Sequence, residues 1–375
     1  VIVVTAVHQS LTHAIMTVEV PAVVGFGNPL LDIYTSLESD DILKKYNLEV
    51  DGEQELPVEI IQQLINEFPP ESKHHVSPGG CAQNTMRVLQ WLCGGVEGRQ
   101  LGIFCGGLGD DPRGKTLDHM VRASGLDTRY AVYPDLPTGV CISMITKPFR
   151  SLVAHLGAAG VYTLENLKHG NLPFSSLKII YIEGFFITHS FDVALELVKV
   201  AAEKGITVAF NISGEYIFQE HHAAICKMVN SSGIVFGNSR EMKALARVLN
   251  LCYNNVEEIP ILLNNLKRVT VGASSKNQSN WFLDNGIIVM TQGGRSPAIV
   301  VWGEGESAEV LPVVPEAPVL DTTGAGDSLV AGFLLGVLAG RRPKSCLQLG
   351  CKVASMIVTR IGVTLPDVVP EHILK

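Results

Sequence analysis

The chain has 375 residues, of which 46% are hydrophobic and 18% charged, so it contains enough apolar material for one large domain with an appendage or for two domains. Its formal net charge is −8 and its basic residues form no run, which argues against a nucleic-acid or polyanion partner. The 8 cysteines form no CxxC pair and the 11 histidines show no zinc-ligand spacing, so we expect reduced, buried thiols and no structural metal.

In chain order, an apolar N-terminal stretch comes first. The first basic residue is Lys44, so the sequence favours neither a secretory signal nor a transit peptide. We interpret residues 1–15 as an extension or a conceptual-translation artefact, and 1–21 as this extension together with the entry to the first strand. The longest strongly apolar run near the C-terminal part, 329–339, is too short to cross a bilayer.

The first part of the chain shows strand, helix and hairpin patterns in succession. The predicted elements are a buried strand at 21–27, two helices joined by a turn at 42–68, a Gly-rich turn and helix at 79–92, a strand at 102–109, a helix at 114–126, and two strands at 139–146 and 151–157. The last two strands indicate a hairpin with residues 147–149 at its turn.

From residue 178 onward, strands and helices alternate. The predicted strands lie within 178–186, 207–213, 232–238, 268–273 and 286–294, and the predicted helices within 190–205 and 239–249. Alternation of this kind predicts an α/β fold with a largely parallel sheet, in which ligands bind beyond the carboxyl ends of the strands. The polar residues that follow strands are therefore the candidate site residues: Asn28, Asp32, Asn211, Asn238, Gln292 and the turn from Asp321 to Asp327.

The stretch from Leu320 to Gly336 places Asp321 and Asp327 on either side of Thr-Thr-Gly-Ala-Gly, before an apolar run. Glycines at the start of a helix let an anion approach the free backbone N–H groups there. A carboxylate beside a bound phosphate is useful if it accepts the proton of an attacking hydroxyl during phosphoryl transfer. The plainer alternative is a tight turn with Asp327 stabilising the helix start. The following run is apolar all round, which predicts a buried helix.

The segment DTTGAGDSLVAGF resembles the second signature of the ribokinase/PfkB family of carbohydrate and nucleoside kinases. Further segments follow the family's order over roughly 22–367: GFGNPLLDI, SPGGCAQNTMRVLQWL, RSLVAHLGAA, YIEGFFIT, FNIS, IVFGNSREMKALA and VMTQGG. Within the family, the chain most resembles the members that phosphorylate adenosine. The resemblance implies a ribokinase-like α/β fold, with a large domain at 22–32, 78–129 and 158–370 and a small α/β lid at 33–77 and 130–157.

The resemblance also implies roles for matching positions. Asp327 would be the base that takes the proton of the nucleoside 5'-hydroxyl, and Arg150 would bind the phosphate. Without the resemblance, Arg150 is typical of a solvated side chain near a turn. The amides of the phosphoryl site would come from Gly324, Ala325 and Gly326. The nucleoside contacts would be Asn28, Asp32, Gln54, Leu56, Gly79, Gly80, Asn84, Leu152 and Phe186. Asp32 would accept hydrogen bonds from both ribose hydroxyls. Phe186 alone is more typical of a core aromatic.

The implied ATP contacts are Asn211, Asn238, Thr291, Gln292, Gly293 and Thr323. Asn238 and Glu241 resemble the family's NxxE element, which organises Mg²⁺ through its waters; alone they form a helix capping box. The implied cofactors are Mg²⁺ with ATP and, as a second candidate, a monovalent cation such as K⁺. Departures from the adenosine-specific pattern are Thr323, Phe149 and the pair Gly214-Glu215, and none removes a group that the mechanism requires.

We therefore expect ATP-dependent phosphorylation of adenosine at the 5'-hydroxyl, giving AMP and ADP in purine salvage. The expected enzyme is a monomer located in the cytoplasm, with the nucleus as a second candidate location, and it has no membrane or nucleic-acid partner. Two alternatives stay open: a family kinase for another nucleoside or a sugar, and a non-catalytic nucleotide-binding paralogue. A dinucleotide dehydrogenase is poorly supported, since no GxGxxG follows the first strand.

Overall fold

The computed structural model describes residues 11, 14, 17–50, 52–68, 75–94, 99–146, 149–271 and 286–374. Within these residues the chain forms two sheets, and the larger one has nine strands. Their spatial order is β14 (Glu306–Val310), β13 (Ala298–Trp302), β12 (Ile287–Thr291), β11 (Ile234–Asn238), β10 (Thr207–Asn211), β9 (Ile179–Glu183), β1 (Val23–Phe26), β5 (Gly102–Gly109) and β6 (Asp127–Tyr133). Neighbours from β12 to β6 pair in parallel, and only the β12–β13 and β13–β14 pairs in this order are antiparallel. The predicted α/β fold with a mainly parallel sheet is confirmed.

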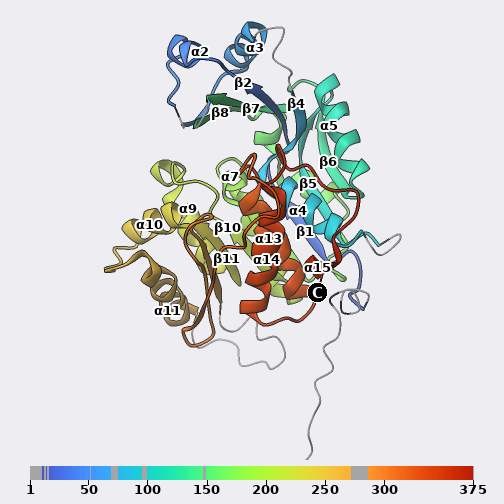
Figure 1. The fold of residues 1–375 in the computed structure, drawn as a ribbon. Helices are drawn as coiled ribbons and strands as arrows, with labels where there is room; N and C mark the ends of the chain where they lie inside the picture. The colour runs from blue at the N-terminus through green and yellow to red at the C-terminus, as the bar shows by residue number, and fades with distance from the viewer. Residues whose placement is uncertain are drawn as a thin grey trace, which may run out of the picture.

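Helices cover both faces of this sheet because successive strand residues point to opposite sides. Val23 belongs to the apolar cluster on one face and Val24 to the cluster on the other. The first face packs against α4 (Cys81–Leu92), α5 (Pro112–Ala123), α13 (Ala325–Leu338), α14 (Pro343–Ile357) and α15 (Glu371–Leu374). The second face packs against α6 (Leu164–His169), α7 (Gly184–Ile187), α8 (Phe191–Lys204), α9 (Phe218–Ser231), α10 (Ser239–Val248) and α11 (Ile259–Val271). Figure 1 shows α13 and α14 in red, in front of the sheet.

Two glycines of α13 bring it into close contact with α14. A Cβ at Gly332 would lie 2.8 Å from the Cα of Gly350, and a Cβ at Gly336 would lie 2.9 Å from the Cα of Cys346. The same helix is apolar on all sides and buried from Asp327 to Val337, as its composition predicted. The two helices are therefore packed backbone against backbone.

The smaller sheet has five described strands in the order β3 (Glu53–Glu55), β8 (Phe149–His155), β7 (Gly139–Thr146), β2 (Leu30–Ser36) and β4 (His75–Gly79). Together with α2 (Asp41–Lys45) and α3 (Val58–Glu67) it forms the upper unit in Figure 1. One face packs on these helices through Ile33, Ile142, Met144 and Val153. The residues between them in the same strands point the other way, toward the large sheet.

Three sequence predictions need correction. Residues 268–271 continue α11 and do not form a strand: the β-branched run suggested a strand, but the buried positions of this helix recur at Ile259, Leu263 and Lys267. The predicted small-domain segment 130–157 starts too early, because residues 130–133 belong to β6 of the large sheet. The predicted turn between the first two helices contains the short strand β3.

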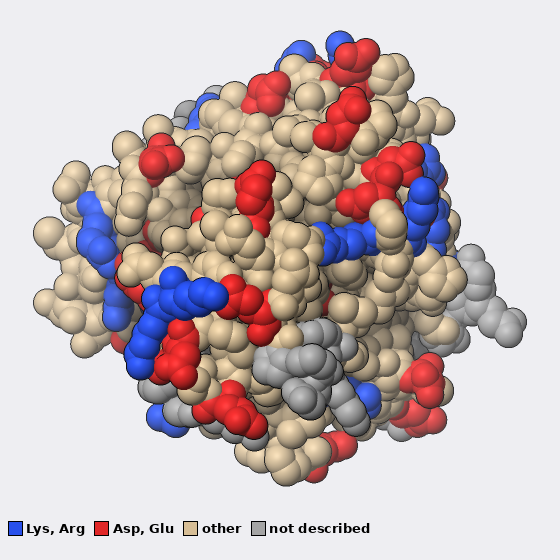
Figure 2. Space-filling view, turned by 90° about the horizontal axis from the view of Figure 1, so that it is seen from above, with Lys and Arg blue, Asp and Glu red and all other residues tan. Residues whose placement is uncertain are grey.

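The surface carries charges of both signs. Figure 2 shows acidic and basic side chains interspersed over the face seen from above. All 8 cysteines are free, but the prediction that they are all buried is wrong, since Cys252 is exposed. Of the helices that the structure describes, none is long and apolar enough to span a membrane. The predicted extension at residues 1–15 lies outside the described residues, apart from Leu11 and Ala14.

Candidate active site

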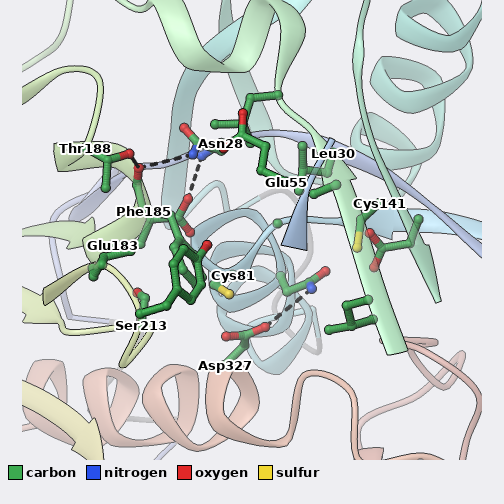
Figure 3. Close-up of a pocket in the computed structure, with 18 of the residues that line it drawn as sticks. Asn28, Leu30, Glu55, Cys81, Cys141, Glu183, Phe185, Thr188, Ser213 and Asp327 are labelled. Atoms are coloured by element: carbon green, nitrogen blue, oxygen red, sulfur yellow. Dashed lines mark hydrogen bonds between the residues drawn. The ribbon is translucent and has the colours of Figure 1, made fainter. Parts of the chain in front are cut away.

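A cavity of about 530 Å³ lies between the free face of the small sheet and the strand ends of the large one. Ten predicted site residues line it: Asn28, Asp32, Gln54, Gly80, Asn84, Leu152, Thr323, Gly324, Gly326 and Asp327. Residues that sequence reasoning did not single out include Tyr34, Cys81, Cys141, Ser143, Glu183, Phe185, Thr188, His189, Ser213 and Tyr216. Figure 3 shows side chains from both sheets pointing into this space.

The small-sheet wall is built by strand alternation. Asp32 and Tyr34 of β2 and Cys141 of β7 face the cavity, because the residues between them are in the small core. The Tyr34 hydroxyl donates to Asp32 Oδ2 over 3.2 Å. A Cβ at Gly79 would lie 1.9 Å from Asp32 Oδ1, so only glycine leaves room for this carboxylate. Gly79 therefore positions Asp32 and is not itself among the lining residues.

The opposite wall carries Asp327 in the first turn of α13. Gly324 precedes the helix with φ 70°, a left-handed conformation that suits glycine, and a Cβ there would lie 2.1 Å from Val363 Cγ2. Asp327 is 8% exposed, and burial raises the pKa of its carboxyl to about 7. Hydrogen bonds from the side chains of Asn84 and Cys81 oppose this rise. A buried carboxyl with such a pKa can exchange a proton near neutral pH.

The other aspartate of the turn has a structural role. Asp321 Oδ1 accepts hydrogen bonds from the N–H and the hydroxyl of Thr323, over 2.9 and 2.7 Å. Its Oδ2 accepts from the N–H of Gly362 over 2.9 Å. Asp321 thereby fixes the loop that leads into α13. The N–H of Ala325 donates to the carbonyl of Thr322 within this loop, and Ala325 does not line the cavity.

Glu183 is the main residue that sequence reasoning missed. It ends β9 and is 1% exposed, and its two oxygens accept from the backbone N–H groups of Asn28 and Ala82. Burial raises the pKa of Glu183 to about 8, and these two backbone hydrogen bonds oppose the rise. The available signal was a single charged residue at the end of the apolar run IIYIE.

Two predicted nucleoside contacts lie elsewhere. Phe186 is fully buried and packs on Phe26 and Tyr162, with ring centroids 6.0 and 5.9 Å apart. The neighbouring Phe185 lines the cavity instead, because α7 begins at Gly184 and helical geometry sends adjacent side chains in different directions. Leu56 packs against the small core and is not among the lining residues.

The predicted nucleotide residues stand at the carboxyl ends of three neighbouring strands. Asn211, Asn238 and Thr291 end β10, β11 and β12, and Gln292 and Gly293 follow. None of these lines the first cavity. Asn238 and Glu241 line a second hollow of about 580 Å³, which shares Ser213, Tyr216 and Gln219 with the first cavity. The backbone of Arg150 pairs with Ile145 in the small sheet, but its side chain lies outside the described part of the chain.

The residues that would organise Mg²⁺ form a closed capping box. Glu241 Oε2 accepts from the Asn238 N–H over 2.8 Å, and Oε1 accepts from Asn238 Nδ2 over 2.6 Å. A carboxylate oxygen has further acceptor capacity, so this pair fits a role in binding the waters of a hydrated ion. Among the described residues, no group of three or more His, Cys, Asp or Glu side chains could hold a metal directly.

Comparison with known proteins places this site in context. The chain is 27% identical to "Adenosine kinase 2" of Arabidopsis thaliana over 350 residues, which cover 92% of this chain and 95% of that relative. It is 28% identical to "Adenosine kinase" of Dictyostelium discoideum over 348 residues, covering 92% of this chain and 96% of that relative.

Solved structures show the same likeness. Anopheles gambiae adenosine kinase in complex with P1,P4-di(adenosine-5) tetraphosphate matches with a TM-score of 0.79 at 29% identity, covering 91% of this chain and 96% of that chain. Schistosoma mansoni adenosine kinase in complex with 2-fluoroadenosine matches with a TM-score of 0.79 at 25% identity, covering 93% and 98%. The profile described as "pfkB family carbohydrate kinase" matches residues 66–370, from the end of α3 to the loop before α15. Since this match spans most of the chain and includes both Asp327 and the turn that precedes it, the chain belongs to the pfkB family of carbohydrate kinases.

Proposed function

We propose that this protein transfers the terminal phosphoryl group of ATP to the 5'-hydroxyl of adenosine, giving AMP and ADP in purine salvage. The observation that carries the proposal is one cavity with two carboxylates on opposite walls: Asp32 on the small sheet and Asp327 at a glycine-flanked helix start. Similarity along nearly the whole chain to relatives named adenosine kinase supports the choice of substrate.

Asp32 would bind the ribose. Asp32 lines the cavity and the residue is 8% exposed, so a hydrogen bond lost there is not readily replaced by water. One carboxylate can accept from both hydroxyls of a cis-diol. Leu152 of the small sheet and Phe185 of the large domain supply apolar lining for the base.

Asp327 would accept the proton of the 5'-hydroxyl. Its pKa of about 7 leaves a substantial ionised fraction at neutral pH and keeps the carboxylate basic enough to take a proton. The side-chain amide of Asn84 donates to Oδ2 over 3.4 Å and holds the orientation of the carboxylate. The proton leaves the hydroxyl as its oxygen bonds to phosphorus, and the ADP oxygen departs with the electrons of the broken bond.

The phosphate end would lie at the N-terminus of α13. A Cβ at Gly326 would have no neighbour within 4 Å, so space for an incoming group adjoins the helix start. The backbone N–H groups of the first turn and the helix dipole favour an anion there. Arg150, carried by β8, would add a guanidinium. Mg²⁺ bound with ATP would supply positive charge at the phosphates, with Asn238 and Glu241 holding its waters.

The small sheet would act as a lid that closes over the nucleoside and excludes water. We propose further that the enzyme is a monomer in the cytoplasm and, in addition, in the nucleus, and that a monovalent cation such as K⁺ supports the reaction.

The deciding experiment is an ATP-turnover assay against a panel of nucleosides and sugars. Adenosine is expected to give the highest kcat/KM. Preference for a sugar would point to the family alternative, and no turnover with any acceptor would point to a non-catalytic nucleotide-binding protein. Asp327→Asn should lower kcat by about 10²–10⁴, while calorimetry shows adenosine binding within a few-fold of wild type. Near-normal kcat in the folded variant would refute the role of Asp327.

A further inference from the structure

Glu183 has no role in the mechanism above, although it is buried beside the cavity. It stands at the carboxyl end of β9, between β1 and β10 in the large sheet. Figure 3 shows its side chain beneath Asn28 and close to Phe185. A carboxyl group buried in this position needs hydrogen-bond partners, because a buried polar group without them is unfavourable.

Its partners are two backbone N–H groups from separate parts of the chain. Oε1 accepts from Asn28, which is 155 residues away, over 2.6 Å, and Oε2 accepts from Ala82, which is 101 residues away. Asn28 belongs to the turn between β1 and β2, and Ala82 is the second residue of α4. The same helix presents Cys81 and Asn84 to Asp327. Glu183 therefore joins the turn that enters the small sheet to the helix that holds the catalytic carboxylate.

The surrounding backbone is shaped around this side chain. A Cβ at Gly27 would lie 2.6 Å from Glu183 Cδ and 2.6 Å from the Cβ of Ala82. Gly27 thus leaves the space that the carboxylate occupies. A carboxyl presents an oxygen to each of the two backbone N–H groups whether it is ionised or protonated, whereas glutamine would turn an NH₂ donor toward one of them.

Glu183 is also electrostatically coupled to the catalytic carboxylate. Asp327 raises the pKa of Glu183, and the buried hydroxyl of Tyr181 and the thiol of Cys81 lie in the same region. Because the pKa of Glu183, about 8, lies above that of Asp327, about 7, Asp327 ionises first and its negative charge opposes the ionisation of Glu183.

We propose that Glu183 is a positioning residue of the kinase reaction, which ties the Asn28 turn to the start of α4 and thereby sets where Asp327 meets the nucleoside. This inference rests on the proposed function, since it concerns the same cavity. Through α4 it acts on the base, and through Asn28 it acts on the nucleoside side of the cavity.

The test is steady-state kinetics of wild type, Glu183→Gln and Glu183→Asp across pH, with adenosine as acceptor. Glu183→Gln should lower kcat/KM for adenosine by about 10- to 100-fold, because one buried N–H loses its acceptor. Its kcat profile should also lack the ionisation near pH 8 that Glu183 contributes in wild type, while the acidic limb of Asp327 near pH 7 stays in place. Glu183→Asp keeps an ionisable carboxyl but is too short to reach both N–H groups, so it should lose kcat/KM as well.

Glu203→Gln, an exposed acid on α8, is the matched control and should behave as wild type. Gly27→Ala provides a second route, since its methyl group displaces the carboxylate while Glu183 itself is retained; it should reproduce the loss of kcat/KM. If wild type is active on adenosine and Glu183→Gln matches Glu203→Gln in both kcat/KM and pH profile, the positioning role is wrong and the proposed function stands. If wild type phosphorylates no acceptor, the proposed function itself fails.

Discussion

Asn84 donates from Nδ2 to Oδ2 of Asp327 over 3.4 Å, and this hydrogen bond joins two helices whose residues lie 243 positions apart in the chain. Arg87, one turn further along α4, donates from Nη1 to Asn84 Oδ1 and to the carbonyl of Val363. Because Asn84 Oδ1 is engaged by a guanidinium, its NH₂ group faces Asp327. The orientation of the proposed base is thus set by the packing of α4 against α13.

The side-chain donors to Asp327 should affect the pH at which kcat falls on the acidic side of its pH profile. Both Asn84 and Cys81 lower the pKa of Asp327, while burial raises it to about 7. Cys81→Ala removes a donor, so the limb should move to higher pH, whereas Cys81→Ser keeps an O–H donor and should leave it close to wild type. Kinetics between pH 5.5 and 9 test this, and equal profiles for both variants would show that the thiol does not contact the base.

Asp32 should discriminate ribose from deoxyribose. Each missing hydroxyl leaves part of the buried carboxylate unpaired, which costs roughly 1–3 kcal/mol, so 2'- and 3'-deoxyadenosine should be about 10- to 100-fold poorer in kcat/KM. Asp32→Ala should lower activity on adenosine and shrink that discrimination. Tyr34→Phe removes one hydrogen-bond donor to Asp32 but leaves the Asp32 carboxylate in place, so its effect on this discrimination should be smaller than that of Asp32→Ala. Undiminished discrimination in Asp32→Ala would mean that another group contacts the ribose.

Arg150 should matter to the phosphate and not to the nucleoside. ATP is strongly anionic and the protein has a net charge of −8, so positive charge must be supplied locally. Arg150→Ala should lower kcat strongly and leave adenosine affinity without ATP nearly unchanged. Arg150→Lys should rescue poorly, because a point charge does not reproduce the planar fork. Arg342→Ala removes the same charge at an exposed position and controls for net charge. A loss of adenosine binding with unchanged kcat would contradict a phosphate role.

The ionised form of Asp327 should lower stability. Its pKa is raised on folding, so the folded protein binds this proton more tightly than the unfolded chain, and stability falls as pH rises from the ordinary carboxyl range through about 7. Asp327→Asn removes this effect. The free energy of unfolding of the variant minus that of wild type should therefore be roughly 1–3 kcal/mol larger at pH 8 than at pH 5. Denaturant unfolding at both pH values measures it, beside the exposed Asp135→Asn as control. A pH-independent difference would show that the carboxyl ionises freely when folded.

The sequence predicted most of the fold because its signals are local. Apolar strand runs, the alternation after residue 178 and the glycines before Asp327 each identified an element without knowledge of its neighbours. Residues 268–271 were assigned to the wrong element because their β-branched run suggested a strand, whereas the backbone there continues the helix that begins at Ile259.

The site was harder to predict where packing decides which way a side chain points. Phe185 and Phe186 are adjacent and chemically identical, and only the start of α7 determines which one faces the cavity. Glu183 was missed for a similar reason: its partners are backbone N–H groups more than 100 residues away, and no residue-type pattern records them.

The close packing of α13 on α14 bears on which changes this protein can tolerate in evolution. Gly332 and Gly336 meet α14 at its backbone, so α13 has one rotational setting about its axis. A single inserted or deleted residue between Asp327 and Gly332 would rotate one end of the helix by about 100° relative to the other. Either the glycines would leave their contacts or the carboxylate would leave the cavity. Single substitutions within this stretch leave both the helix packing and the position of Asp327 in place, whereas an insertion or deletion there removes one or the other.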